Sequence, residues 1–557
     1  MSTSRKIQAK PVLIVKEESS DRGKNAQLNS IRAARAISEV MKSSLGPKGM
    51  DKMLVTNFGD ILITNDGRTM LQEMDLQHPA ARMMVDVAKT IDNEVGDGTT
   101  SSVVLAGELL GKAEQLIKKG VHPAVIVDGY EKAAEKALET LEKIAIPVSL
   151  RNIDELKKIA ATSLSSKIIA NLKEPLSEII VSAALSVKKE IAGENVVDLD
   201  DVMVEKRLGE SLESTSLISG VIINKEILHP AMPRRVEKAK IALLDKALDI
   251  EKANFDSKLQ IDSPEQIEDF IKQEDAVIGR LVDKIATTGA NVLILQEDLN
   301  KLAYYLLAEK GILAVRRVQQ TILKKVAKAT GGHIISNLDV LTEKDLGFAE
   351  VVEQRTIGDA KMLFIEDCKN PHSVAILIRG ANKRVVDEAE RSIHDALCVV
   401  RDVFREQKIV AGGGAPEIET ARAVRKFALT LDGKEQLAAV SFADALEIVP
   451  ATLSENAGLN SIDILPELRS IHEKGEVWAG VNVFEGKIQD MKALEVFEPL
   501  SVKKQIIISA TEAAVMILKV DELVSTKKPI RREEEPKGER AKEEKRRERM
   551  QQFTSMM

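Results

Sequence analysis

A short glycine-rich stretch early in the chain has residue types that could bind phosphate. Residues Gly96–Ser101 read Gly-Asp-Gly-Thr-Thr-Ser and lead into a segment with helical apolar spacing. Glycines before a helix let backbone N–H groups approach an anion, and the helix N-terminus favours negative charge. Asp97 could hold Mg²⁺ against a phosphate, and Thr99, Thr100 and Ser101 add hydroxyl donors. The stretch predicts a nucleotide triphosphate site, although an ordinary loop with a Thr or Ser N-cap fits it about equally well.

Three further segments contain residues that could complete such a site. Leu45–Gly49 reads Leu-Gly-Pro-Lys-Gly and would either simply end a helix or bring backbone N–H groups close to phosphate. Asn65–Gly67 is typical of a tight turn, but Asp66 could also orient water or a metal near the terminal phosphate. Gly412–Gly414 precede Pro416, a favourable first helical residue, and would be a flexible connector or a cradle for ribose or base.

Asp395 is the candidate general base. It falls in a predicted helix that starts near Lys383, off the apolar stripe, on a face shared with Glu388 and Asp402. Most acids in such positions are solvated, which is the simpler interpretation. Hydrolysis, however, needs a carboxylate that accepts a proton from the attacking water, and Asp395 could supply it.

Composition limits the class of protein. A chain of 557 residues with 44% apolar content predicts three or four folded domains. Two cysteines, Cys368 and Cys398, offer no disulfide framework, so a reducing cytoplasm is expected. No apolar run approaches the roughly 18 residues that span a bilayer, so no membrane partner is expected. Thr526–Met557 is basic, and the rest of the chain is correspondingly more acidic than the overall net charge of −7, which argues against a general nucleic-acid binder.

The expected elements suggest a helical domain interrupted by an α/β insert. Helices dominate to about Ile146 and again from Lys383, whereas short apolar runs alternate with helices between them. This alternation favours a parallel sheet. The charged insert Asp249–Glu274 has little that belongs to a core and could project as a helical arm. The expected central strands lie near Ile241–Leu244, Val292–Leu295, Ile312–Val315 and His333–Ser336.

Taken together, the motifs resemble those of the group II chaperonins, the family of the archaeal thermosome and the eukaryotic cytosolic chaperonin. The likeness covers nearly the whole chain, from about Val12 to Val524. The matching segments, in chain order, are Leu45–Met53, Thr64–Gly67, Gly96–Thr100, His394–Leu397 and Gly412–Ala415.

The resemblance implies a multidomain α+β fold with a mostly helical equatorial domain built from both termini, a small intermediate domain and an α/β apical domain. The equatorial segments would be 1–147 and 403–525, the intermediate segments 148–216 and 368–402, and the apical domain 217–367 with a helical protrusion near 249–274, before a charged tail at 526–557.

The resemblance also implies an ATP-dependent chaperone that encloses unfolded proteins in a double ring of the same or paralogous subunits. ATP or ADP and Mg²⁺ would be its cofactors, and the cytoplasm its location. Asp395 would activate water with help from Asp66, and Asp97 would bind Mg²⁺. The residues implied to hold the nucleotide are Gly46, Pro47, Gly98, Thr99, Thr100, Ser101, Ser166, Gly413, Glu498 and Lys503.

One departure from the family pattern leaves the turnover rate open. After Asp66-Gly67 the chain continues Arg68-Thr69-Met70, where the family usually has Ala-Thr-Ile. A cationic Arg68 could tune hydrolysis or a ring contact. Two alternatives therefore stand beside a chaperonin: a small-molecule phosphotransferase, and a structural ring or filament subunit that binds nucleotide with little turnover.

Overall fold

The computed structural model describes residues 24–55, 61–166, 169–191, 193–249, 264–369 and 373–522. The chain divides into two compact units, Ser30–Lys519 and a unit made from its two ends. The charged tail at 526–557 lies outside the described residues, as do residues 250–263 of the expected arm. The fold is mixed α+β with several small sheets.

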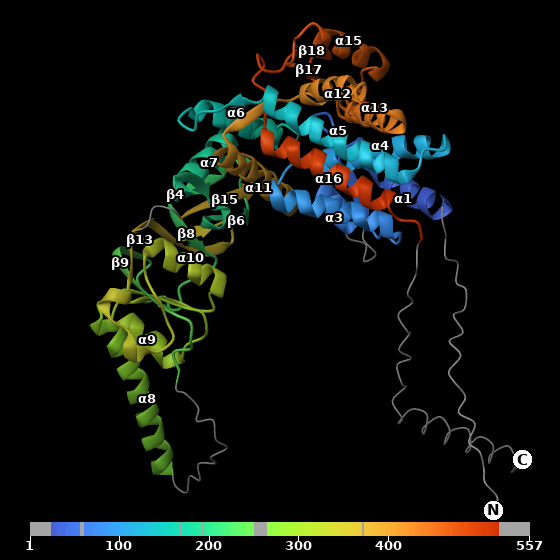
Figure 1. Ribbon diagram of the computed structural model, residues 1–557. Coiled ribbons are helices and arrows are strands. Elements are labelled where there is room, and N and C mark those ends of the chain that lie inside the picture. Colours follow the sequence, from blue (N-terminus) through green and yellow to red (C-terminus); the bar gives the residue numbers. More distant parts are fainter. Residues whose placement is uncertain are drawn as a thin grey trace, which may run out of the picture. The chain divides into compact units, whose positions relative to one another are not determined.

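Helices from the first and the last parts of the chain build one apolar core. Its buried residues come from 31–141 and from 410–518, and α16 packs against α4 and α5 (Figure 1). Tyr130 and Phe442, from the two parts, meet edge to face with ring centroids 5.6 Å apart. The helices are α1 (Lys24–Lys42), α2 (Gly67–Glu73), α3 (Pro79–Glu94), α4 (Thr99–Lys118), α5 (Pro123–Ile144), α12 (Ala415–Ala428), α13 (Gly433–Leu446), α14 (Ile448–Asn456), α15 (Ser461–Glu473) and α16 (Leu500–Leu518).

Local sequence explains where several of these helices begin. His78 and His122 accept a backbone hydrogen bond as N-caps, and each precedes a proline, Pro79 or Pro123, in the first turn. Proline suits this position because its missing N–H would have no partner inside the helix. Asn382 caps the later helix α11 (Lys383–Glu406) in the same way, through the N–H of Val385.

Small sheets accompany these helices. The hairpin of β1 (Lys52–Val55) and β2 (Ile61–Thr64) leads to α2, and a second hairpin pairs β17 (Ala479–Asn482) with β18 (Lys487–Asp490). A three-stranded sheet places β16 (Lys408–Ala411) between β3 (Ile146–Pro147) and β19 (Phe497–Pro499). The β1–β2 hairpin and the β3–β16–β19 sheet lie in connections between helices. All three sheets position residues of the site described below.

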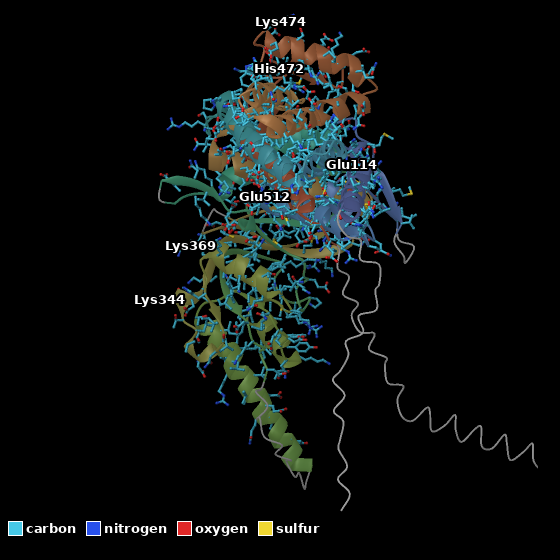
Figure 2. The ribbon with its side chains drawn as sticks, turned by 45° about the vertical axis from the view of Figure 1, so that its right-hand side comes forward. Glu114, Lys344, Lys369, His472, Lys474 and Glu512 are labelled. Carbon is cyan, nitrogen blue, oxygen red and sulfur yellow. The ribbon has the colours of Figure 1, made fainter. Side chains whose placement is uncertain are left out.

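A buried histidine ties the β17 hairpin to the helices. His472 on α15 is fully buried; Figure 2 shows it within this part of the molecule. Its Nδ1 lies 3.0 Å from Glu419 of α12, and its Nε2 lies 2.9 Å from the carbonyl oxygen of Ala479 in β17. The strand is therefore anchored to two helices.

A second core lies around α11. It combines residues 148–204 with residues 374–409 and Phe497. Its elements are α6 (Ile153–Leu164), α7 (Lys173–Val187), β4 (Lys188–Ile191), β5 (Glu194–Val197), the short 3-10 helix η2 (Leu199–Asp201), β6 (Val202–Leu208), β7 (Ser216–Ile218), β15 (Val374–Gly380) and α11.

The middle of the chain forms a seven-stranded sheet with the strand order β11-β10-β9-β13-β14-β8, and β12 also pairs with β9. The expected strands and helices are present, but the sheet is mixed rather than parallel. β9, β10, β11 and β12 are parallel, whereas a tight two-residue turn at Gly358-Asp359 makes β13 and β14 an antiparallel hairpin. The elements are β8 (Gly220–Ile223), β9 (Arg235–Leu244), α8 (Pro264–Thr287), β10 (Val292–Leu295), α9 (Lys301–Glu309), β11 (Leu313–Val315), α10 (Gln320–Thr330), β12 (Ile334–Ile335), β13 (Gly347–Ile357) and β14 (Ala360–Cys368).

Among the described residues, one helical stretch is long and apolar enough to cross a membrane, by length and composition alone. This stretch is Gly433–Asn456, which comprises α13 and α14 and contains an 18-residue window with a mean hydropathy of 1.4. Of this apolar window, 67% is buried inside the protein, and Phe442 and Leu446 belong to the first core. Its apolar character is therefore explained by packing.

Candidate nucleotide-binding site

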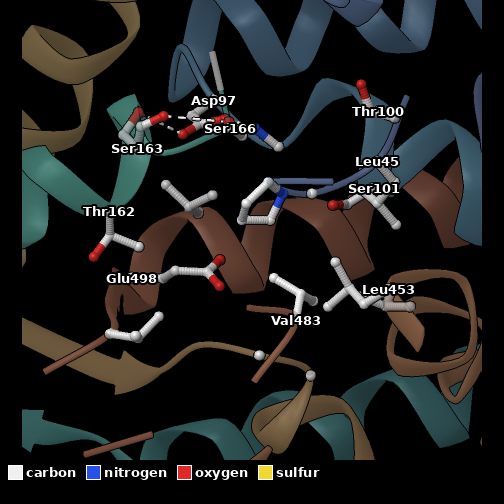
Figure 3. Close-up of a pocket in the computed structure, with 18 of the residues that line it drawn as sticks. Leu45, Asp97, Thr100, Ser101, Thr162, Ser163, Ser166, Leu453, Val483 and Glu498 are labelled. Atoms are coloured by element: carbon white, nitrogen blue, oxygen red, sulfur yellow. Dashed lines mark hydrogen bonds between the residues drawn. The ribbon is translucent and has the colours of Figure 1, made fainter. Parts of the chain in front are cut away.

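One cavity collects the motifs that are far apart in the sequence. It encloses about 220 Å³ and is lined by the loop after α1, the β2–α2 junction, the start of α4, the end of α6, the β17 hairpin and the start of α16 (Figure 3). Of the predicted site residues, the lining includes Gly46, Pro47, Asp66, Asp97, Gly98, Thr99, Thr100, Ser101, Ser166, Gly413, Glu498 and Lys503. Asp395 is the predicted site residue that is not part of the lining.

The N-terminus of α4 faces this cavity. Gly98 is the N-cap in the left-handed conformation, with φ of +83° and no side-chain cap, so backbone N–H groups of the first turn remain for a ligand. A Cβ on Gly67 would lie 2.9 Å from Thr99 Oγ1 and 2.7 Å from Thr100 Oγ1. Both hydroxyls therefore lie against the β2–α2 junction.

Asp97 is held from two sides. The N–H of Gly98 donates to Asp97 Oδ1 at 2.6 Å, and Ser163 Oγ at the end of α6 donates to Oδ2 at 2.9 Å; Figure 3 shows Ser163 and Asp97 facing each other. Mg²⁺ often binds proteins through one carboxylate plus substrate phosphates, and a single oriented Asp97 fits that pattern. In the part of the chain that the structure describes, no cluster of three or more His, Cys, Asp or Glu could hold a metal by itself.

Asp66 and Asn65, at the end of β2, both line the cavity. Asp66 caps α2, and its Oδ2 accepts from Thr69 N at 2.9 Å and from Thr69 Oγ1 at 2.5 Å. Asn65 Nδ2 donates to the carbonyl oxygen of Ser166 at 2.7 Å. The Asn65–Gly67 segment is thus not an isolated tight turn but a strand end that leads directly into a helix.

The three acids on α11 are buried rather than solvated. Their exposed fractions are 1% for Glu388, 7% for Asp395 and 3% for Asp402. Residues seven apart lie on one helix face, two turns from each other. Glu388 accepts from Thr64 Oγ1 at 3.3 Å, so this face of α11 is turned toward the end of β2, where Asp66 begins the next helix.

Asp395 lies between contacts that bring α11 to the cavity. One turn further on, Val399 lines the cavity. A Cβ on Gly96 would lie 2.3 Å from Cys398 Cβ, so the loop that carries Asp97 rests on α11. Along α11, Asp395 thus lies between Glu388, which contacts Thr64, and Cys398, which contacts the Gly96 loop, and it is not part of the cavity lining.

His394 adds positive charge next to the candidate base. Its Nδ1 lies 3.9 Å from Asp395 Oδ1 and 3.8 Å from Cys398 Sγ. The interaction with Asp395, and then that with Cys398, raises the pKa of His394 to about 10. The pKa of His394 therefore leaves this imidazole protonated near neutral pH, next to Asp395.

Glu498 and Lys503 share one buried ion cluster with Glu417. Lys503 Nζ lies 2.7 Å from Glu417 Oε1 and 2.8 Å from Glu498 Oε2. Burial lowers the pKa of Lys503, but the charges of Glu417 and Glu498 outweigh burial and hold that pKa above its ordinary value. Burial raises the pKa of Glu498, against the opposing effect of Lys503. In Figure 3 the Glu498 carboxylate points into the cavity, so it can accept a hydrogen bond from a ligand.

Two cations near the motifs have partners within the fold. The guanidinium of Arg68 forms an ion pair with Asp92 of α3, and Arg68 does not line the cavity. Lys48 Nζ lies 5.7 Å from the centroid of the Phe484 ring. Arg68 is therefore paired within the fold, whereas Lys48 lies at the ring of Phe484, a residue of the cavity lining.

Several residues of the site were missed by sequence analysis. Ser163, which holds Asp97, stands in the same turn as Ser166, and only Ser166 was singled out. Glu417 follows the glycines of Gly412–Gly414 in the first turn of α12 and has no motif of its own. The β17–β18 hairpin adds a mostly apolar wall that has no local sequence signal, because its position depends on packing against α12 and α15. Its lining residues are Val481, Asn482, Val483, Phe484 and Met491.

Comparisons with known proteins agree with this site. The sequence profile of the TCP-1/cpn60 chaperonin family matches residues 37–528. Thermosome subunit alpha of Archaeoglobus fulgidus is 51% identical over 539 residues, which cover 97% of this chain and 99% of that protein. A thermosome subunit of Methanopyrus kandleri is 51% identical over 91% of this chain and 93% of its own length. Thermosome subunit beta of Sulfurisphaera tokodaii is 50% identical, with 96% and 97% covered. The chain belongs to the TCP-1/cpn60 chaperonin family.

Proposed function

We propose that this chain is a chaperonin subunit that hydrolyses ATP and uses the nucleotide cycle to fold other proteins. The observation that carries the proposal is the cavity itself, because segments from both ends of the chain converge on the N-terminus of α4. Backbone N–H groups and hydroxyls at a helix N-terminus bind phosphate. Membership of the chaperonin family supplies the link from ATP hydrolysis to folding.

Within the cavity we assign the triphosphate to the α4 side and the nucleoside to the Glu498 side. Gly98, Thr99, Thr100 and Ser101 would hold the phosphates, with Gly46, Pro47 and Ser166 at the edges of the same space. Asp97 would hold Mg²⁺, which supplies positive charge to the phosphates when bound. Glu498, positioned by Lys503, and Gly413 would contact the nucleoside.

Asp395 would be the general base, assisted by Asp66. The assignment is supported by the neighbours of Asp395 on α11, since Cys398 contacts the Gly96 loop and Val399 lines the cavity. A small shift of α11, or a bridging water, would bring the carboxylate to the attacking water.

Replacement of Asp395 tests the assignment. We expect Asp395→Ala to bind ATP with nearly unchanged affinity and to lose at least about 100-fold in hydrolysis rate, the usual contribution of a positioned base. The matched control is Glu390→Ala on the same helix, since Glu390 pairs with Lys206 and not with the cavity. Hydrolysis by Asp395→Ala at the parent rate would show that another group is the base.

The domain layout is part of the proposal. The first core joins both ends of the chain, as an equatorial domain at 1–147 and 403–525 would. The second core joins 148–204 to 374–409, which supports an intermediate domain at 148–216 and 368–402. A third core lies on the seven-stranded sheet, and nearly all of its residues fall within 217–367, the expected apical domain. The protrusion near 249–274 would complete that domain.

The partners would be unfolded proteins and further chaperonin subunits, identical or paralogous, in a double ring in the cytoplasm. Relatives named thermosome subunit alpha and subunit beta support a ring of one or of two kinds of subunit. Negative-stain images of the purified chain would show stacked toroids if identical subunits are sufficient. Images with only single subunits would require a paralogue.

A second candidate function is a nucleotide-binding ring subunit with little turnover, which Arg68 suggested from the sequence. The ion pair of Arg68 with Asp92 weakens this alternative. Turnover by assembled particles decides between the two, because only the chaperonin proposal requires it. A phosphotransferase would instead show ATP consumption that depends on an added small acceptor, and family membership does not favour it.

A further inference from the structure

The side-chain oxygen of Asn65 is buried beside the cavity and lacks a hydrogen-bond partner among the described residues. The residue lines the cavity and is only 8% exposed. Its Oδ1 is buried and has no hydrogen-bond partner among the described residues. A buried polar atom without a partner costs free energy, so its presence at a ligand cavity indicates that the ligand or its water provides the partner.

The orientation of the Asn65 amide follows from its other contact. Nδ2 donates to the carbonyl oxygen of Ser166 at 2.7 Å, and a carbonyl oxygen can only accept, so the nitrogen faces Ser166. Oδ1 must therefore point the other way. The backbone on both sides is also fixed, since Thr64 Oγ1 donates to Glu388 and accepts from the N–H of Asp66 at 3.1 Å.

An acceptor in this place excludes some partners. A phosphate oxygen has no proton to donate and would be repelled by Oδ1. A water molecule can donate, and hydrolysis of ATP requires one near the terminal phosphate. Asp66, the next residue, is already expected to help orient it.

We propose, on the basis of the proposed function, that Asn65 is a catalytic residue whose Oδ1 accepts a hydrogen bond from the water that attacks the terminal phosphate. The water oxygen forms a bond to the terminal phosphorus as the bond to the bridging oxygen breaks, and that electron pair leaves with ADP. One water proton passes to Asp395. The other remains on the phosphate product and is the proton that faces Asn65.

The test compares three full-length variants in ATP-binding and single-turnover assays. Asn65→Ala should bind ATP within about twofold of wild type and lose at least about tenfold in hydrolysis rate, the equivalent of one hydrogen bond made chiefly in the transition state. Asn65→Asp keeps an acceptor in place but loses the donor to Ser166. It should therefore recover part of the rate, although its added charge weakens ATP binding.

The control is Asn482→Ala, which removes another asparagine of the cavity lining whose side chain accepts from the N–H of Phe484. It should affect ATP binding more than hydrolysis. The proposal is overturned if Asn65→Ala hydrolyses ATP at the wild-type rate, if both Asn65 variants lose binding and rate together, or if Asn65→Ala only raises the Mg²⁺ or K⁺ concentration needed for binding. An inactive wild type in the same assay would instead refute the proposed ATPase function itself.

Discussion

At the scale of single residues, the acids of α11 show how burial changes the meaning of a sequence position. Glu388, Asp395 and Asp402 all avoid the apolar stripe, which in an isolated helix would make them solvated. In the folded chain each is covered by a neighbouring segment. Glu388 is paired with Arg391, and Asp402 with Arg401, so the burial of these two charges is partly compensated.

Asp402 provides a pH-dependent prediction. Burial raises the pKa of Asp402 to about 6, against the opposing charge of Arg401, whereas an unfolded Asp has a pKa of about 3.9. Between these values the folded protein holds a proton that the unfolded chain has released, so stability falls as pH rises from about 4 to about 6.

Asp402→Asn removes this titration. We expect the free energy of unfolding of the variant, relative to that of wild type, to increase by up to about 3 kcal/mol as pH rises from about 4 to about 6. Above pH 6 the difference should stay constant. Thermal unfolding midpoints at several pH values measure the difference. A difference that is the same at pH 4 and pH 7 would show that Asp402 does not titrate in this range.

At the scale of elements, the site depends on how closely the loop before α4 approaches α11. Gly96 has φ of +71°, and its missing Cβ leaves room for Cys398. The same loop presents Asp97 and the first turn of α4 to the cavity. The close packing of this loop on α11 and the binding of a ligand by the first turn of α4 therefore depend on the same two elements.

Gly96→Ala should separate the loop from α11. We expect a loss of a few kcal/mol in stability, because a Cβ would lie 2.3 Å from Cys398 Cβ, and at least tenfold weaker ATP binding. Gly120→Ala is the matched control: Gly120 has φ of +83° but nothing within 4 Å of its Cβ position. It should cost only about 1 kcal/mol of backbone strain and leave ATP affinity unchanged. Calorimetric titration with ATP measures the binding, and equal effects of the two substitutions would refute the packing argument.

At the scale of the whole molecule, segments distant in the sequence are joined by cores and by a few buried ion pairs. Asp201 of η2 has a side chain that is 3% exposed and contacts Lys189 of β4 and Lys328 of α10. In the proposed layout this cluster connects the intermediate and apical domains. Burial opposes ionisation, but hydrogen bonds from Lys189 and Lys328 hold the pKa of Asp201 below its ordinary value.

Asp201→Asn should lower stability by about 1–3 kcal/mol, because two ammonium groups lose their carboxylate partner. The control is Asp339→Asn, since Asp339 pairs with Lys284 but its side chain is 79% exposed; an exposed pair contributes less than about 1 kcal/mol. Thermal unfolding in low and high salt distinguishes the two variants, because salt should weaken the exposed Asp339 pair but leave the stability loss of Asp201→Asn largely unchanged. Equal, salt-sensitive effects would show that the buried cluster contributes no more than a surface pair.

The sequence by itself determined the local parts of this protein. The start of α11 at Lys383, the proline in the first turn of α12 and the glycine-led start of α4 follow from caps, backbone freedom and helical periodicity, which act over a few residues. All of the predicted site residues except Asp395 also line one cavity. Domain boundaries and residue roles stay predictions.

Only the tertiary structure decided which of these parts meet. It left Asp395 out of the cavity lining, directed Arg68 to Asp92, made the sheet mixed by pairing β13 antiparallel to β9, and left Asn65 Oδ1 buried without a hydrogen-bond partner among the described residues. None of these outcomes is encoded in a short window. Each depends on burial and on contacts between separate segments of the chain, which form only when the chain has folded.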